Sequence, residues 1–273
     1  MTVTETAEEF YAGFTQRNRG LIPDEVQQAL RAAKVVIAGC GSTGGAAVEP
    51  IARLGVRRFA LAEPGDYELN NLNRQHAAYA EIGRNKGEVA AERVRAINPY
   101  AETDVYTAGV QLDNVHALLD GCDVVVDGVD VTTPKGWQAK FALHAEAARR
   151  GVPVISGYDM SGTQYVRYYD YASGIAPLAG QVTEEAIAAE TVWELLLRVV
   201  PREVIPEDLI ADVRANRDDP EYSLPQLVYT SLLFGVLASR YVVELLAGRL
   251  VREELVLDVH QAVRPPVTSK EET

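Results

Sequence analysis

A glycine-rich hexapeptide, Gly39-Cys40-Gly41-Ser42-Thr43-Gly44, is the first feature of this 273-residue chain that could do chemistry. It follows an apolar run at residues 34–38 and precedes a helical pattern. Such glycines let the backbone approach a phosphate, and the N–H groups that open the next helix attract an anion. Glu63, 19 residues after Gly44, can accept hydrogen bonds from both ribose hydroxyls. The pattern predicts a nucleotide site and fits NAD and ATP equally well.

A polar stretch follows at residues 68–75, Glu-Leu-Asn-Asn-Leu-Asn-Arg-Gln, where a dehydrogenase would continue into its second helix. Arg74 is placed to reach the phosphates of a nucleotide whose ribose lies at Glu63. The alternative is a solvated loop, with Arg74 and Lys86 in structural salt bridges and Asp130 as a strand-end cap. Ligands bind at strand ends in open α/β sheets, which favours the functional interpretation.

Alternating strand and helix patterns surround these residues. Residues 24–33 predict a helix, and segments 34–38, 46–54 and 58–62 predict the strand, helix and strand of one Rossmann half. The alternation continues with predicted helices at residues 86–97, 114–119 and 136–150 and predicted strands at 103–106, 123–127 and 152–156. We therefore expect an α/β fold with a Rossmann-like, doubly wound and mostly parallel sheet.

The pattern changes in the second half, where residues 164–171 predict a strand that can run antiparallel. Helices are predicted within residues 180–216, a polar loop at 217–224, a final strand at 254–259 and a disordered tail at 269–273. Segment 227–248 is apolar nearly all round but contains Arg240 and Glu244, which indicates a buried or interface helix and no membrane span. We expect one domain, residues 1–273: a nucleotide-binding core at about 17–157, then substrate-side strands, a helical insert and a dimerisation helix at about 158–273.

Composition excludes several classes of function. The net charge is −13, from 26 basic and 39 acidic side chains, which argues against DNA, tRNA and anionic lipid as partners. Cys40 and Cys122 are the only cysteines, so one chain can build neither a disulfide framework nor a four-cysteine zinc site. The acidic N-terminus does not resemble an export signal, and we expect a cytoplasmic protein.

At this point the sequence resembles the ThiF/MoeB/HesA superfamily, adenylating enzymes similar to the catalytic half of ubiquitin-activating enzymes. The resemblance rests on GCGSTGG, ELNNLNRQ, IGRNKGEVAAERVRAINP and VVVDGVD, and it covers about residues 17–157. The later segment ASRYVVELLAGR is similar to the family's last helix.

The resemblance implies an ATP site and a homodimer. Gly39, Gly41 and Gly44 would belong to the loop that cradles phosphate, and Asp130 would hold Mg²⁺. Glu63 stands where the family usually has Asp for the ribose. The residues that would handle the phosphates are Asn71, Arg74, Gln75 and Lys86. Relatives also have an arginine that reaches the partner's site, and the candidates for it here are Arg17 and Arg19.

The sequence also departs from the family pattern. Gly65 replaces a second acidic residue, Val131 replaces a common asparagine, and the zinc cysteines of many relatives are absent. No cysteine follows Cys122, so we expect no covalent thioester stage. The four histidines show no metal-ligand spacing and are interpreted as core or surface residues, and the tyrosines of residues 158–171 as core more than as the lining of an acyl site.

The favoured hypothesis is an ATP- and Mg-dependent adenylyltransferase that activates a carboxylate, the C-terminus of a small ubiquitin-like carrier protein or a peptide, for an external nucleophile. Cations and a metal suit this chemistry because two anions must approach and pyrophosphate must leave. The alternatives are a tRNA-modifying dehydratase of the same superfamily, an NAD-dependent oxidoreductase, or a nucleotide-binding scaffold. The acyl substrate and the final nucleophile are left open.

Overall fold

The computed structural model describes residues 5–216, 218–219 and 222–265; the predicted tail at 269–273 and part of the predicted loop at 217–224 lie outside this range. The helices are α1 (Ala7–Phe14), α2 (Asp24–Ala32), α3 (Thr43–Arg53), α4 (Lys86–Ile97), α5 (Val115–Leu118), α6 (Pro134–Arg150), α7 (Glu184–Ala189), α8 (Val192–Val199), α9 (Glu207–Asn216), α10 (Val228–Leu246) and α11 (Val259–Val263). Short 3₁₀ turns connect several of them, including Gln16–Asn18 and Leu69–Asn71.

One seven-stranded sheet runs through the molecule in the order β3-β2-β1-β4-β5-β6-β7. Its strands are β1 (Lys34–Ala38), β2 (Arg58–Ala62), β3 (Glu102–Tyr106), β4 (Val124–Asp127), β5 (Val154–Met160), β6 (Thr163–Tyr169) and β7 (Glu254–Asp258). Strands β1 to β5 pair in parallel, and β6 and β7 are added antiparallel. The predicted doubly wound sheet with antiparallel additions is confirmed.

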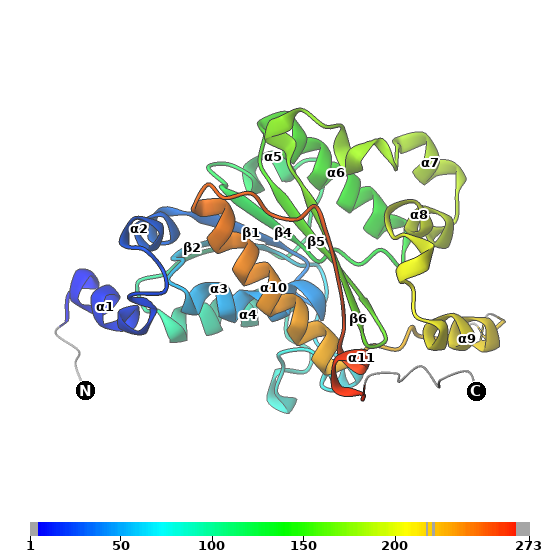
Figure 1. Ribbon diagram of the computed structural model, residues 1–273, viewed down its shortest axis with the longest axis horizontal. Helices are drawn as coiled ribbons and strands as arrows, with labels where there is room; N and C mark the ends of the chain where they lie inside the picture. Colours follow the sequence, from blue (N-terminus) through cyan, green and yellow to red (C-terminus); the bar gives the residue numbers. More distant parts are fainter. Residues whose placement is uncertain (1–4, 217, 220–221, 266–273) are drawn as a thin grey trace, which may run out of the picture.

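Two apolar layers cover the sheet, one on each face (Figure 1). Helices α2, α3, α4 and α10 cover one face around a core that includes Ile37, Ile51 and Phe234. Helices α5, α6 and α8 cover the other face around a core that includes Trp137 and Leu143. The central strands are therefore buried on both sides, as their continuous apolar runs require.

Helix α10 packs along α3 so closely that a Cβ on Gly235 would lie 2.2 Å from the carbonyl oxygen of Ala46. By length and composition alone α10 could cross a bilayer, yet half of that stretch is buried inside the molecule. It is a core helix on this side. Its other side leaves Leu232 and Val236 exposed.

Most element boundaries agree with the predicted ones within one or two residues, and three of the differences have a local description. Helix α3 starts at Thr43, three residues before the predicted start at 46, because the helical backbone of Gly44 and Gly45 packs where no Cβ would fit. Strand β5 continues to Met160 because it pairs along its whole length with β6 in a hairpin. The predicted strand at 164–171 ends at Tyr169, and Tyr171 begins a 3₁₀ turn.

Candidate nucleotide site

The glycine-rich loop lies where the carboxyl ends of β1 and β4 meet, and two of its glycines are required by packing. Gly39 has a φ of +82°, and a Cβ there would lie 2.3 Å from the carbonyl oxygen of Gly128. A Cβ on Gly44 would lie 2.0 Å from the carbonyl oxygen of Gly39. These glycines let the loop close tightly against the end of β4.

Gly41 is different, because no backbone crowds its Cβ position. The nearest atoms to a Cβ there are those of the Gln75 side chain, at 3.8 and 3.9 Å. Gln75 Oε1 is buried and has no hydrogen-bond partner among the described residues. Helix α3 begins two residues later, so its first N–H groups lack intrahelical acceptors. This part of the loop has the open backbone and the free N–H groups that a phosphate ligand would use, whereas Gln75 Oε1 is an acceptor that still needs a donor.

Glu63, at the end of β2, ties that strand to the loop. Its Oε2 accepts the N–H of Cys40 at 2.6 Å, and its Oε1 accepts the N–H of Gly65 at 2.8 Å. Burial raises the pKa of the Glu63 carboxyl, although these N–H groups and the Lys86 ammonium oppose the shift. Each oxygen keeps a second lone pair, so the ribose contact stays a prediction.

Lys86 opens α4, behind a helix cap in which the Asn85 side chain accepts the N–H groups of Gly87 and Glu88. Its Nζ lies 5.9 Å from the ring centroid of Tyr67 and within 3.5 Å of where a Gly65 Cβ would stand. Among the described residues it has no ion-pair partner. Gly65, which replaces an acidic residue of the family pattern, therefore leaves room for an ammonium whose charge is not neutralised by contact.

Arg74 is half-buried and fixed from three directions. Its Nη1 donates to the carbonyl of Asn70 and to Oδ1 of Asn73, and its Nε donates to Oε1 of Gln226 at 2.6 Å. Gln226 lies two residues before α10, so a segment far along the chain helps to aim this guanidinium. Asn71, in contrast, uses its side chain within the loop: it accepts the N–H of Glu68 and donates to Asn70.

Asp130 is exposed in the turn after β4. Its Oδ1 accepts the N–H and the hydroxyl of Thr132 at 2.9 and 2.8 Å. Among the described residues no three His, Cys, Asp or Glu side chains form a metal-binding group. One carboxylate is nevertheless a fitting donor for Mg²⁺, which typically takes its other oxygens from phosphates and water.

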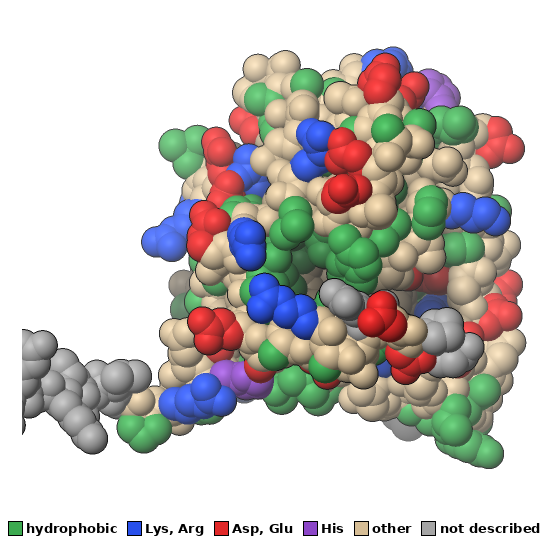
Figure 2. Space-filling model, turned by 90° about the vertical axis from the view of Figure 1, so that its right-hand side faces the viewer, with side chains coloured by type: hydrophobic (Ala, Val, Ile, Leu, Met, Phe, Trp, Pro, Cys, Tyr) green, Lys and Arg blue, Asp and Glu red, His purple; other side chains and the backbone are tan. Residues whose placement is uncertain are grey.

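Arg17 and Arg19 are not gathered with these residues. They lie in and beside the exposed turn between α1 and α2, at the left of Figure 1, whereas β5 runs towards the lower right. Figure 2 shows the right-hand side, which carries α8, α9 and the tip of the β5–β6 hairpin. That face is hollowed at its centre, with hydrophobic side chains in the hollow and charged side chains around it.

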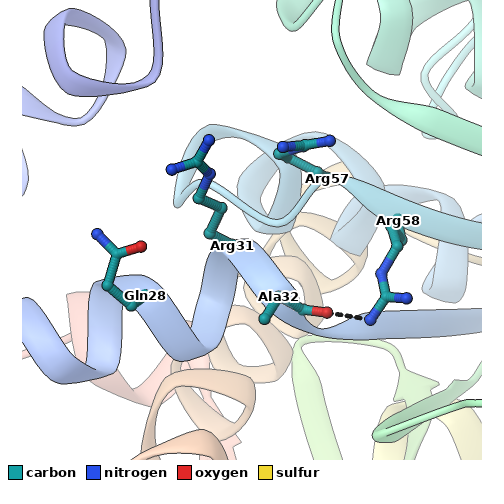
Figure 3. Close-up of a pocket in the computed structure, with 5 residues that line it drawn as sticks. All are labelled: Gln28, Arg31, Ala32, Arg57 and Arg58. Carbon is teal, nitrogen blue, oxygen red and sulfur yellow. Dashed lines mark hydrogen bonds between the residues drawn. The ribbon is translucent and has the colours of Figure 1, made fainter. Parts of the chain in front are cut away.

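An open cavity lies at the opposite, amino-terminal end of the sheet (Figure 3). It has about 390 Å³ and is lined by Gln28, Arg31, Ala32, Arg57 and Arg58. Its guanidinium groups are already engaged: Arg31 pairs with Glu8, Arg57 with Glu102, and Arg58 donates to the carbonyl of Ala32. This cavity is separate from the candidate nucleotide site, which lies at the other end of the strands.

A buried polar network between the end of β4 and helix α6 was not predicted from the sequence. Asp127, the last residue of β4, pairs with Lys140 and His144 of α6, and Ser156 donates to its Oδ2 at 2.6 Å. His144 Nε2 lies 2.9 Å from Asp127 Oδ2, and its Nδ1 lies 2.6 Å from the Tyr171 hydroxyl. The spacing of Lys140 and His144, four residues apart on a helix, was the available signal.

Ionisation in this network follows from burial and pairing. Although burial acts in the opposite direction, Lys140 and His144 hold the pKa of Asp127 well below its usual range. Burial lowers the pKa of His144 against the pull of Asp127. Asp127 Oδ1 also accepts the N–H of Val129, so the network fixes the turn that leads to Asp130. His144 is a core histidine, as expected, and Tyr158, Tyr165 and Tyr169 are core as well.

Comparison with known proteins gives one family. The model described as the ThiF family matches residues 15–248. Among curated proteins, the chain is 33% identical over 171 residues to the tRNA threonylcarbamoyladenosine dehydratase of Escherichia coli, covering 60% of this chain and 62% of that protein. It is 28% identical over 153 residues to the sulfur carrier protein adenylyltransferase of Thermus thermophilus, covering 55% of each.

An uncharacterised Mycobacterium tuberculosis protein, MT1398, is 34% identical over 165 residues, which are 60% of this chain but 22% of that protein. The chain thus spans from about a fifth to three fifths of the length of these relatives.

Among solved structures, PaaA aligns with a TM-score of 0.65 at 17% identity, over 95% of this chain and 82% of that chain. The E. coli dehydratase TcdA in complex with ATP aligns with a TM-score of 0.59 at 22% identity, over 90% and 98%. These structures share the fold.

Proposed function

The chain belongs to the ThiF family, since that family's model matches residues 15–248, and we propose that it is an ATP- and Mg-dependent adenylyltransferase that activates a carboxylate. The observation that carries this proposal is the placement of Lys86 and Arg74 around the glycine loop. The Lys86 ammonium lacks a contacting counter-charge among the described residues, and Arg74 is held by neutral oxygens only. Two cations without a contacting carboxylate suit a polyphosphate ligand.

The residues have separate tasks in this reaction. The open backbone at Gly41 and the first turn of α3 bind phosphate oxygens, and Glu63 accepts from the ribose. Lys86 and Arg74 offset charge as a substrate carboxylate oxygen attacks the α-phosphorus. The bond between that phosphorus and the bridging oxygen breaks, and pyrophosphate leaves with its electron pair. Mg²⁺ held by Asp130 would supply further stabilisation of the phosphate charge.

For the substrate, we propose the C-terminus of a small ubiquitin-like carrier protein or a peptide. The support is that one relative is named a sulfur carrier protein adenylyltransferase and another, in Haloferax volcanii, a SAMP-activating enzyme E1, 32% identical over 145 residues. The acyl-adenylate would pass to an external nucleophile, because both cysteine thiols lie in surroundings that keep them protonated.

A tRNA-modifying dehydratase is the second candidate, favoured by the 33% identity to an enzyme of that name. The net charge of −13 weighs against a tRNA partner. The two candidates differ in the substrate that supports exchange of labelled pyrophosphate into ATP. A carrier protein or peptide with a free C-terminal carboxylate is expected to support this exchange, and tRNA is not. Retention of tRNA on the immobilised protein would favour the dehydratase.

An NAD-dependent role is tested more simply. Thermal stabilisation by ATP with Mg²⁺ is expected to exceed that by NAD, because Lys86 and Arg74 suit a triphosphate. Stabilisation by NAD alone, or hydride transfer from NADH, would contradict the adenylation proposal.

Finally, we propose a homodimer in which Arg17 or Arg19 completes the partner's site. Both arginines are exposed and lie away from the chain's own glycine loop. The exposed side of α10, with Leu232 and Val236, and the edge strand β7, with Leu257 on the same face of the sheet, offer apolar side chains for pairing.

A further inference from the structure

A buried carboxyl group, that of Asp159, lies against the phosphate loop and has no part in the proposed function. Successive residues of a strand face opposite sides of the sheet, and Gly157 and Asp159 of β5 face α3 and α10. The packing is close: a Cβ on Gly157 would lie 2.4 Å from the Phe234 ring and 2.7 Å from the Thr43 side chain. Asp159 therefore sits between the start of α3 and the start of α10.

Its two oxygens are in different situations. Oδ2 accepts hydrogen bonds from the hydroxyls of Ser231 at 3.1 Å and Ser42 at 3.3 Å. Oδ1 is buried and has no hydrogen-bond partner among the described residues. Ser42 is the fourth residue of the glycine-rich loop, directly before α3, so Asp159 is bonded to the loop that would hold the phosphates.

The groups that face Asp159 explain its ionisation. The loop contributes the hydroxyl of Ser42, α3 that of Thr43, and α10 that of Ser231; Gln164 of β6 lies opposite Asp159 in the register. The charged group that acts on it is Arg74. Burial raises the pKa of Asp159, although the three hydroxyls and Arg74 oppose the shift.

An anionic carboxylate in this place would repel a triphosphate and compete with it for Arg74. A neutral acid has the opposite effect. Its carbonyl oxygen can keep both serine hydrogen bonds, and its hydroxyl, on the oxygen that lacks a partner, can donate to a phosphate oxygen. Approach of the phosphate charge favours this neutral form further.

We propose that Asp159 binds the phosphate chain of the nucleotide as a neutral carboxylic acid, donating from Oδ1, so that nucleotide binding is coupled to uptake of a proton. This inference rests on one part of the proposed function, which is that the ligand is ATP. The proton comes from solvent and stays on Asp159 while the nucleotide is bound.

The experiment is titration calorimetry of the full chain with Mg²⁺ and the non-hydrolysable analogue adenosine 5′-(β,γ-imido)triphosphate. The number of protons taken up is obtained at pH 7 to 8 from buffers with different ionisation enthalpies. Asp159→Asn keeps the shape and a donor but cannot titrate, and Asp113→Asn, at an exposed loop position, is the matched control. Buried Glu63 and the analogue itself also exchange protons, but they do so equally in both proteins.

The wild type and Asp113→Asn are expected to take up more protons per nucleotide than Asp159→Asn, by up to one. The affinity of Asp159→Asn should also fall less between pH 6 and 8. Asp159→Ala, which loses the donor, should bind about 10- to 100-fold more weakly. Equal proton uptake in wild type and Asp159→Asn would overturn the proposal, as would loss of Mg²⁺ dependence in Asp159→Asn, which would indicate an anionic metal ligand.

A second measurement uses the wild type alone, in case Asp159→Asn does not fold. Infrared difference spectra on addition of the analogue should show a new band of a protonated carboxylic acid that shifts in D₂O, and its absence would also overturn the proposal. If the wild type binds no adenine nucleotide, the proposed function itself fails, which is a distinct result.

Discussion

The Nε of Arg74 donates a hydrogen bond to Oε1 of Gln226 at 2.6 Å, across 152 residues of sequence. The main chain of Gln226 also accepts a hydrogen bond from the Asn73 side chain, at 3.4 Å. The segment that leads into α10 therefore fixes the direction of a guanidinium of the candidate site. This makes Gln226 a positioning residue for Arg74.

Replacing Gln226 with Ala should weaken productive ATP binding, because Arg74 loses the acceptor that aims it. We expect the KM for ATP in pyrophosphate exchange to rise by about 10-fold, with the melting temperature almost unchanged. Gln226→Glu keeps an acceptor oxygen for Nε but adds a carboxylate that neutralises the guanidinium, so its KM for ATP should stay raised. Identical KM values in Gln226→Ala and wild type would show that Arg74 needs no such support.

Replacing Asp130 with Ala tests the metal role. Loss of a preorganised electrostatic element should lower the rate of pyrophosphate exchange by about 100- to 1000-fold. Because Asp130 is exposed, its loss as a turn cap should reduce the free energy of unfolding by only about 1 kcal/mol. Thr132→Val, which removes the hydroxyl that donates to Asp130 but keeps the carboxylate, is the control. Exchange that survives Asp130→Ala would exclude the metal role.

Local patterns in the sequence predict most of the fold and part of the site. The glycine loop and Glu63 could be predicted because their spacing within one strand-helix-strand unit fixes their places. The contacts of Arg74 with Gln226 and of Asp159 with Ser231 join distant segments, and no local periodicity encodes them. Asp127 and His144 looked unremarkable for the same reason: only the packing of α6 over the end of β4 makes them partners.

The buried network should make the protein sensitive to acid. The pKa values of His144 and Asp127 are lowered in the folded state, so the stability that each contributes is present above its unfolded pKa and lost as the pH falls through the folded value. The loss should begin below about pH 6.5 for His144 and below about pH 3.9 for Asp127. Asp127→Asn leaves Lys140 buried without a counter-charge and should destabilise the fold by about 3 to 5 kcal/mol.

Urea unfolding from pH 7 to pH 3 measures both effects. Because Asp127 raises the pKa of His144 against the effect of burial, the unfolding free energy of Asp127→Asn should fall more steeply than that of the wild type below about pH 6.5. Glu92→Gln, which breaks an exposed ion pair with Arg84, is the control and should follow the wild type closely. If Asp127→Asn is as stable as the wild type at neutral pH, the buried network does not contribute to the free energy of unfolding.

Neither cysteine should be needed for turnover. Burial raises the pKa of Cys122 to about 12 and that of Cys40 well above its usual range, so both thiols are protonated and weakly nucleophilic at neutral pH. The Cys40→Ala, Cys122→Ala double variant should keep adenylation within a few-fold of the wild type. A thiol-sensitive covalent adduct with a substrate would contradict this expectation.

If each site is completed by an arginine of the partner, two inactive variants should recover activity when they are mixed, which a monomer cannot do. Arg17→Ala, Arg19→Ala should abolish exchange if one of these side chains completes the partner's site, and Asp130→Ala should abolish it from within the chain. In a mixture of the two inactive proteins that exchange subunits freely, about half of the dimers would be mixed, and one of the two sites in each would be intact. Activity should therefore return to about a quarter of the wild-type value after mixing, as measured by pyrophosphate exchange. Light scattering gives the independent check of the assembly: a monomer at micromolar concentration, or full activity in the double arginine variant, would exclude an arginine donated by the partner.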